Sequence, residues 1–204
     1  MADNIPWFPE EVLPNSMSIN LRSNSKIFES PFNRSASSHR FPGEQWVMTL
    51  NYSTLDNFTK PEIDILQSFI WSLQGVNGRF YARDYTKRNV RAKGNPVVQG
   101  DDQYGSVLTT SGWTPNQLVI PRGHYFSVND ELKYATKDIW SGSTGVAVME
   151  FTPWLRNSPA SGTPINVSNA RGVFRLADND QGTFELTPGI EGTLTLNLME
   201  AFSV

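Results

Sequence analysis

Only one stretch of this 204-residue sequence has the periodicity of an α-helix, and most of the rest alternates or turns. In that stretch, apolar side chains recur at three- and four-residue steps, at Ile63, Leu66, Phe69, Ile70 and Leu73. A single amphipathic helix must bury its apolar stripe, and the only available cover is a β-sheet. The sequence therefore predicts a mainly β fold that carries one α-helix.

Both ends of this helix have recognisable signals. Thr59-Lys60-Pro61-Glu62 matches the capping box, in which the Thr hydroxyl accepts from the third helical N–H and the Glu carboxylate reaches back to the cap. Gly75 can supply the left-handed residue that follows a last helical turn. We expect the helix to lie between these two signals.

Period-two alternation predicts strands near both ends of the chain. Residues 45–52 alternate most clearly and place Trp46, Met48, Leu50 and Tyr52 on one face. Residues 193–198 place three leucines on one face and need a sheet to join. Shorter strands are expected at 18–22, 79–84, 173–176 and 183–186.

The middle of the chain, residues 90–171, has no helical period. Short β runs alternate there with glycine-containing turns, at 106–110, 117–120, 125–128, 131–134 and 146–151. Such a set has the size of a small closed or half-closed barrel, and closure removes exposed strand edges. The basic turn at residues 86–89 marks a plausible domain edge before it.

Residues 23–43 are polar and basic, with three phenylalanines between the charges. One interpretation is a mobile surface loop. The other is an extended hairpin that reaches across a subunit boundary, where aromatic residues and Arg are enriched. Residues 1–17 form a proline-punctuated apolar arm that either folds back on its own domain or docks on a neighbour. From these two segments the candidate subunit-interface residues are Trp7, Phe28, Phe32, Arg34, Arg40 and Phe41.

Composition excludes several classes of protein. The chain has no cysteine, which removes disulfide frameworks, thiolate zinc sites and cysteine nucleophiles. Its formal charge of −3 disfavours nucleic-acid binding as its main role, because phosphate binding normally needs a basic face. We see no signal peptide at the N-terminus and no run of ~20 apolar residues, so we expect no membrane insertion and synthesis in the cytoplasm.

We find no pattern that predicts catalysis. The two histidines, His39 and His124, have no companion at metal-ligand spacing, and no Gly-x-Ser-x-Gly elbow is present. The acidic pairs at residues 10–11 and 101–102 lie in turn-like sequence, where adjacent carboxylates are usually solvated. We therefore expect no catalytic residue, no metal and no cofactor, and the chain is not expected to be an enzyme.

Several ordered segments resemble the tail-tip proteins of siphophages and prophages of Gram-negative bacteria. They lie at residues 73–84 (Leu-Gln-Gly-Val-Asn-Gly-Arg-Phe-Tyr-Ala-Arg-Asp), 111–115 (Ser-Gly-Trp-Thr-Pro), 122–126 (Arg-Gly-His-Tyr-Phe), 151–156 (Phe-Thr-Pro-Trp-Leu-Arg) and 171–176 (Arg-Gly-Val-Phe-Arg-Leu). Pro159 and residues 162–165 (Gly-Thr-Pro-Ile) continue the series. Over about residues 45–200 the chain resembles the siphophage distal tail proteins.

This resemblance implies a β-sandwich-like domain with one helix, formed by residues 1–87 and 172–204, and an OB-like barrel inserted at residues 88–171. It also implies a structural virion protein of the tail tip, at the baseplate hub. Six copies would form a homohexameric ring that joins the tail tube to the tip complex and lets DNA pass. The implied partners are other copies, the tube protein, the tip or hub proteins and the tape measure protein, with no catalytic residue to transfer.

A carbohydrate-binding module acting in host-surface attachment is the alternative. In that case Trp113, Trp140 or Trp154 would be exposed on the barrel and would stack against sugar rings. Trp154, between a proline and a leucine, is better explained as core or interface packing. A plain tail-tube or other minor tail subunit is a third possibility within the structural class.

Overall fold

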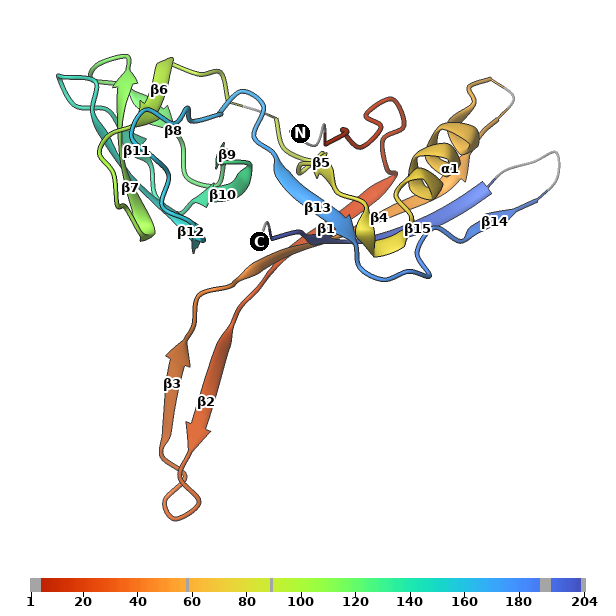
Figure 1. The fold of residues 1–204 in the computed structure, drawn as a ribbon, viewed down its shortest axis with the longest axis horizontal. Coiled ribbons are helices and arrows are strands. Elements are labelled where there is room, and N and C mark those ends of the chain that lie inside the picture. The colour runs from red at the N-terminus through yellow and green to blue at the C-terminus, as the bar shows by residue number, and fades with distance from the viewer. Residues whose placement is uncertain (1–4, 58, 89, 188–191, 203–204) are drawn as a thin grey trace. The chain divides into compact units, whose positions relative to one another are not determined.

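The computed structural model describes residues 5–57, 59–88, 90–187 and 192–202 (Figure 1). Strands make up 46% of the chain and helical segments 7%, so the predicted mainly β fold is confirmed. The described residues form two compact units. One comprises the described parts of Met1–Asn20, Trp46–Arg88 and Arg171–Val204, and the other those of Leu21–Gln45 and Asn89–Ala170. The two-domain division expected at 87/88 and 171/172 remains a prediction.

The first unit is built on a curled antiparallel sheet drawn from both ends of the chain (Figure 1). Its strand order is β1-β4-β15-β13-β5, and β14 also pairs with β15. The strands are β1 (Ser16–Arg22), β4 (Gln45–Leu55), β5 (Phe80–Ala82), β13 (Gly172–Leu176), β14 (Phe184–Leu186) and β15 (Gly192–Glu200). The C-terminal strand β15 therefore finds the sheet it needs, between β4 and β13.

Alternation in β4 and β15 builds the core of this sheet. The four expected residues of β4 are all buried, and Leu194, Leu196 and Leu198 of β15 are buried with them. Leu50 lies opposite Leu196, so the two apolar faces coincide. The backbone N–H of Trp46 donates to the buried Glu200 carboxylate at 3.1 Å. The predicted strand faces are confirmed.

The helix α1 spans Glu62–Ser72, and the expected capping box is wrong. Pro61 is the N-cap residue, and no side chain caps the helix. A proline disfavours helical backbone in the residue before it, so Lys60 cannot join the helix and Glu62 becomes its first residue rather than its third. The Glu62 carboxylate instead accepts from the Asp56 N–H at 3.2 Å, and the Asp56 carboxylate accepts from the Thr59 N–H at 3.1 Å.

The apolar stripe of α1 packs on the sheet beside β14 and β15, as the sequence predicted (Figure 1). Leu66, Ile70 and Leu73 are buried. Ile70 lies directly against Gly182, where no Cβ fits. At the C-terminal end the left-handed residue is Gln74 (φ 55°), one position before the expected Gly75, which also has a positive φ and begins a short 3₁₀ turn, η1 (Gly75–Asn77).

The N-terminal segment, as far as it is described from residue 5, folds back on its own unit. Phe8 and Val12 are buried, and Phe8 lies 5.3 Å from the ring of Phe69 and 5.7 Å from that of Phe80. Trp7 forms a parallel bridge with Tyr81 of β5, which covers that edge of the sheet. Of the two interpretations of this arm, packing within the chain is therefore confirmed for these residues.

The second unit contains a five-stranded antiparallel sheet in the order β6-β7-β12-β10-β9 and a two-stranded pair, β8-β11. The strands are β6 (Gly94–Val98), β7 (Gly105–Trp113), β8 (Leu118–Ile120), β9 (Tyr125–Val128), β10 (Glu131–Ala135), β11 (Ile139–Trp140) and β12 (Ala147–Leu155). All five expected strands are present, whereas β6 and β11 were not predicted. Gly112, expected to end a strand, lies inside β7 instead.

The segment at residues 163–166 contacts both edge strands of this sheet. The Ile165 N–H donates to the carbonyl of Pro96 in β6 at 2.9 Å. Asn166 and Ser127 of β9 exchange two backbone hydrogen bonds of 2.8 and 2.9 Å. The edges of β6 and β9 are therefore both partly paired with one short segment. A buried apolar cluster that includes Leu108, Phe126 and Phe151 fills the interior of the unit.

Residues 25–40 form an antiparallel hairpin of β2 (Ser25–Glu29) and β3 (Ala36–Arg40) (Figure 1). The segment is therefore a hairpin, whereas its expected reach across a subunit boundary remains a prediction. In contrast, the expected exposure of Trp113 is wrong. Its side chain is 3% exposed, and its indole N–H donates to the Thr110 hydroxyl at 2.8 Å. Within the described residues, no helix is long and apolar enough to cross a bilayer.

Candidate interaction surface

The hairpin β2–β3 and the residues that close it, Asn24 to Phe41, form an arm that no third strand joins. Every residue of β2 and β3 is exposed, and Arg40 at the base is the residue of the two strands that contacts side chains outside the arm. The Phe41 N–H donates to the Asn24 carbonyl at 2.7 Å and closes its base. An isolated two-stranded hairpin is at best marginally stable in water. The exposed strands of the arm would therefore be stabilised by a partner that covers them.

The arm exposes large apolar side chains. Ile27 is 73% exposed, Phe28 55%, Phe32 97% and Phe41 41%. Single exposed apolar residues are common, but four within one 18-residue ribbon are a concentration typical of interaction sites. The arm thus has the composition of an interface core that is uncovered in the single chain.

The tip of the arm has a defined conformation. The Arg34 N–H donates to the Ser30 carbonyl at 3.0 Å, and the Ser30 N–H donates to the Ser35 carbonyl at 2.8 Å. The Asn33 carboxamide oxygen accepts from the Ser35 N–H at 3.1 Å and from its hydroxyl at 2.8 Å. Arg34 itself has a positive φ of 55°. These bonds define the backbone from which Phe32 and Arg34 project, which lowers the entropy cost of binding a partner.

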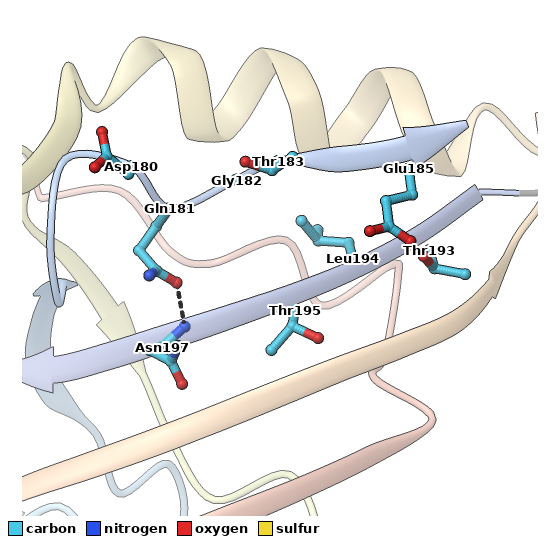
Figure 2. A pocket seen from close by; sticks show the side chains of 9 residues that line it. All are labelled: Asp180, Gln181, Gly182, Thr183, Glu185, Thr193, Leu194, Thr195 and Asn197. Carbon is cyan, nitrogen blue, oxygen red and sulfur yellow. Dashed lines mark hydrogen bonds between the residues drawn. The ribbon is translucent and has the colours of Figure 1, made fainter.

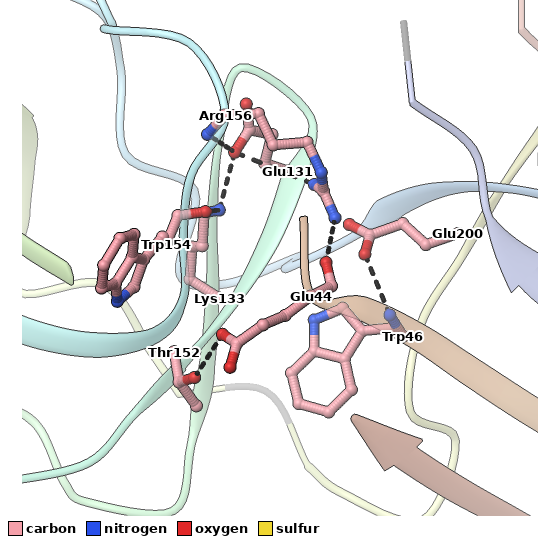
Figure 3. A network of polar contacts seen from close by, with 8 residues as sticks. All are labelled: Glu44, Trp46, Glu131, Lys133, Thr152, Trp154, Arg156 and Glu200. Carbon is pink, nitrogen blue, oxygen red and sulfur yellow. Dashed lines mark hydrogen bonds and ion pairs between the residues drawn. The ribbon is translucent and has the colours of Figure 1, made fainter. Parts of the chain in front are cut away.

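Glu44, just after the arm, is buried and anchors it (Figure 3). Arg40 donates to both Glu44 carboxylate oxygens, at 3.0 and 2.7 Å. The Thr152 hydroxyl donates to the same carboxylate at 3.3 Å, and Arg156 donates to the Glu44 carbonyl at 3.1 Å. The Arg40 guanidinium also lies 4.9 Å above the Trp154 ring. The end of β3 is thereby tied to β12.

A buried lysine supports this anchor from the neighbouring strand (Figure 3). Lys133 of β10 is fully buried and donates to the Glu131 carboxylate at 2.6 Å and to the Trp154 carbonyl at 2.8 Å. The Arg156 N–H donates to Glu131 as well, at 3.2 Å. Buried charges persist only when they are paired and hydrogen-bonded. This ionic cluster therefore fixes the strands to which the arm is anchored.

The structure brings five of the six candidate interface residues together. Phe28, Phe32, Arg34, Arg40 and Phe41 all belong to the arm. Trp7 does not. It lies in the other compact unit, 5.4 Å from the Tyr81 ring, with the Arg171 guanidinium 5.4 Å from the Trp7 centroid and 4.1 Å from that of Tyr81.

Two contributors escaped the sequence reasoning. Ile27 belongs to the exposed apolar set, and its position next to Phe28 was the available signal. Glu44 gave no signal, because its partners Arg40 and Thr152 meet it only through the tertiary structure.

Neither histidine belongs to a cluster of metal-ligating side chains among the described residues. No three His, Asp or Glu side chains among them lie close enough to hold a metal ion. His39 is exposed on the arm, 5.8 Å from the Phe28 ring. His124 is half-buried, and its Nδ1 has no hydrogen-bond partner among the described residues. Neither imidazole is placed beside a carboxylate that would orient it for catalysis.

The chain matches no protein-family model, and no curated protein is significantly similar to it. The arm is therefore the structural feature from which a function is best argued.

Proposed function

We propose that this chain is a structural protein of a long-tailed phage virion, a distal tail protein whose copies assemble into a ring. The observation that carries the proposal is the arm, an ordered ribbon that is exposed on both faces and bears Ile27, Phe28, Phe32 and Phe41. A ribbon of this kind contributes little to the stability of its own chain. Its function is to be covered by another chain.

An arm that docks on a different surface of the next copy makes a head-to-tail contact. Contacts of this kind form closed rings when the rotation between copies is suitable, whereas self-complementary contacts stop at a dimer. The proposed ring is a hexamer at the tail tip. It joins the tail tube protein to the tip or hub proteins, lies next to the tape measure protein and lets DNA pass through its centre.

The charge of the chain suits this role. A formal charge of −3 gives DNA no basic wall to which it would adhere during passage. The role requires no catalytic residue, metal or cofactor, no sequence-specific contact with nucleic acid and no insertion in a membrane. We infer accordingly that the protein is not an enzyme.

The finer fold belongs to the same proposal. Strands from both ends of the chain form one sheet, and α1 packs on it, which supports a β-sandwich-like domain. Residues 89–170 have their own sheet, and the pairing of residues 163–166 with both β6 and β9 supports an inserted OB-like barrel. In this architecture the first domain forms the ring and the insert is available to other tail proteins.

Electron microscopy tests the proposal. Purified protein, or tail tips isolated from virions, should show a closed ring with a central channel that antibodies against this chain label. Virions whose tails assemble normally after deletion of the gene would contradict it.

The alternative, a carbohydrate-binding module, retains one supporting observation. Trp140 is 61% exposed on β11, whereas Trp113 is buried and Trp154 lies under the Arg40 guanidinium. An exposed indole can stack on a sugar ring. Binding on a glycan array that disappears in Trp140→Ala would favour this function, and the absence of any glycan binding would leave the structural role.

A further inference from the structure

The arm and the rest of the chain have opposite charge. The arm, Asn24 to Phe41, contains three basic residues, Lys26, Arg34 and Arg40, and one acidic residue, Glu29, for a formal charge of +2. Since the whole chain has 17 basic and 20 acidic residues, the remainder has 14 and 19, for a charge of −5. The arm of one copy is therefore attracted to the body of another.

An open acidic groove of about 320 Å³ lies on the other compact unit, between β14 with its preceding loop and β15 (Figure 2). Asp180 and Glu185 contribute carboxylates, and Thr183, Thr193 and Thr195 contribute hydroxyl groups. Glu185 and Thr193 lie opposite each other on paired strands, and the Thr193 hydroxyl donates to the carboxylate at 3.5 Å. The lining is thus rich in acceptors for hydrogen bonds.

The charges of this groove are not neutralised within the chain. Neither Asp180 nor Glu185 makes an ion pair with any residue that the structure describes. A groove with two free carboxylates and few apolar atoms suits a cationic side chain better than an apolar one. Arginine fits best, because its planar guanidinium has five donors, no acceptor and a geometry matched to carboxylates.

Arg34 at the tip of the arm is such an arginine. It is exposed and forms no ion pair within the described parts of the chain, whereas Arg40 is already used by Glu44. The hydrogen-bonded tip holds it in place beside Phe32. The extended part of the arm, β2 (Ser25–Glu29), is roughly 15 Å long, and the turn that follows places Arg34 at its far end.

We propose that the arm tip of one copy docks in the groove of the next, with Arg34 paired to the carboxylates of Asp180 and Glu185. The arm and the groove are different surfaces, so each copy both donates an arm and accepts one. This inference rests on the proposed self-assembly and assigns its contact. The occupant of the groove is a second copy of this chain.

A charge swap in the full-length protein tests the contact. Arg34→Glu and Glu185→Arg should each weaken self-association by at least about tenfold, because each places like charges together. The double variant Arg34→Glu/Glu185→Arg should recover most of the loss, because the pair is re-formed with its signs exchanged. Sedimentation velocity at low and high salt measures the association, which should weaken with added salt.

The matched control is Arg122→Glu, which makes the same charge change at an exposed arginine outside the arm. It should leave association near the wild-type value, and combining it with Glu185→Arg should give no recovery. If the two controls behave like Arg34→Glu and its swap, the effect is one of net charge and the assigned contact is wrong.

The absence of cysteine allows a second, geometric test. Ser35→Cys combined with Thr183→Cys should give disulfide-linked multimers on oxidation, whereas Ser35→Cys with Asn157→Cys should give none. The wild-type protein can form rings while neither the disulfide-linked multimers nor the charge-swap recovery is observed. In that case the assigned contact is wrong and the proposed function stands. Rings that form without the arm would contradict the assigned contact and leave the proposed ring in place.

Discussion

At the scale of single residues, Tyr85 is half-buried, and its buried hydroxyl has no hydrogen-bond partner among the described residues. A buried hydroxyl without a partner costs about 1–3 kcal/mol. We expect Tyr85→Phe to raise the free energy of unfolding by about 1 kcal/mol in urea denaturation. The matched control is Tyr52→Phe, which removes a hydrogen bond of 3.4 Å to the Val12 carbonyl and should be neutral or destabilising. Equal losses from both substitutions would contradict the expectation.

The same two tyrosines determine the response to alkaline pH. Burial raises the pKa of Tyr52 well above its usual value near 10, and burial with the nearby Glu10 carboxylate does the same for the pKa of Tyr85. Below pH 10 the two tyrosines stay protonated in the folded and the unfolded chain, so their ionisation does not affect stability. Above it only the unfolded chain ionises, so stability falls by about 1.4 kcal/mol per pH unit for each tyrosine. Denaturation between pH 9 and 11.5 measures this slope, which should flatten in Tyr52→Phe/Tyr85→Phe.

Lys133 should depend strongly on Glu131. Glu131→Gln leaves a fully buried ammonium without its carboxylate and should cost about 3–5 kcal/mol of unfolding free energy. Lys133→Met should cost less, because Glu131 keeps its bond from the Arg156 N–H. The double variant should be more stable than Glu131→Gln alone, as measured by thermal and urea unfolding. If the double variant is the least stable of the three variants, the attraction between Lys133 and Glu131 does not offset the cost of burying their charges.

At the scale of elements, the contact between α1 and the sheet depends on a residue without a side chain. Gly182 has a φ of +88°, and a Cβ there would lie 2.6 Å from the Ile70 Cγ2 atom. Gly162 has nearly the same φ, +87°, but open space around its Cβ position. Gly162→Ala should therefore cost about 1–2 kcal/mol from backbone strain alone.

Gly182→Ala should cost more, because overpacking against α1 adds about 1–3 kcal/mol to the same strain. The difference between the two variants in urea unfolding isolates the helix–sheet contact. Similar losses would mean that α1 can shift without cost.

At the scale of the whole molecule, folding and assembly should be separable through the arm. Ser25 and Arg40 pair at its base, so replacing residues 26–39 by Asn-Gly closes the ribbon with a two-residue hairpin turn and keeps the Arg40–Glu44 pair. The unfolding free energy should change by less than about 1 kcal/mol, because the removed side chains are exposed.

The shortened protein should no longer associate in sedimentation velocity. Ser37→Ala, an exposed change on the intact arm, is the control and should associate like the wild type. Association of the shortened protein with wild-type affinity would show that the arm is not the interface.

The sequence by itself determined the mainly β class, the one helix and the positions of most strands. Alternation is a local property of the sequence, so it predicts which face of a strand is buried whatever the strand packs against. The alternating residues from Trp46 to Tyr52 and from Leu194 to Leu198 are buried in this way. It also located the arm as a basic, aromatic segment, although a loop and a hairpin remained equal interpretations. The two-residue strand β11 is too short to display a period, and Gly94-Asn95-Pro96 gives β6 the composition of a turn.

Only the tertiary structure decided which of these features meet. Pro61 and the bonds between Asp56 and Glu62 moved the start of the helix, because competing local contacts outweighed the capping motif. Trp113 is buried since its neighbours from other strands cover it, and burial depends on such distant partners. The anchor of Glu44 on β12 and the groove between β14 and β15 join residues far apart in the chain. No pattern along the sequence encodes these pairings, because each arises where separate strands are brought together.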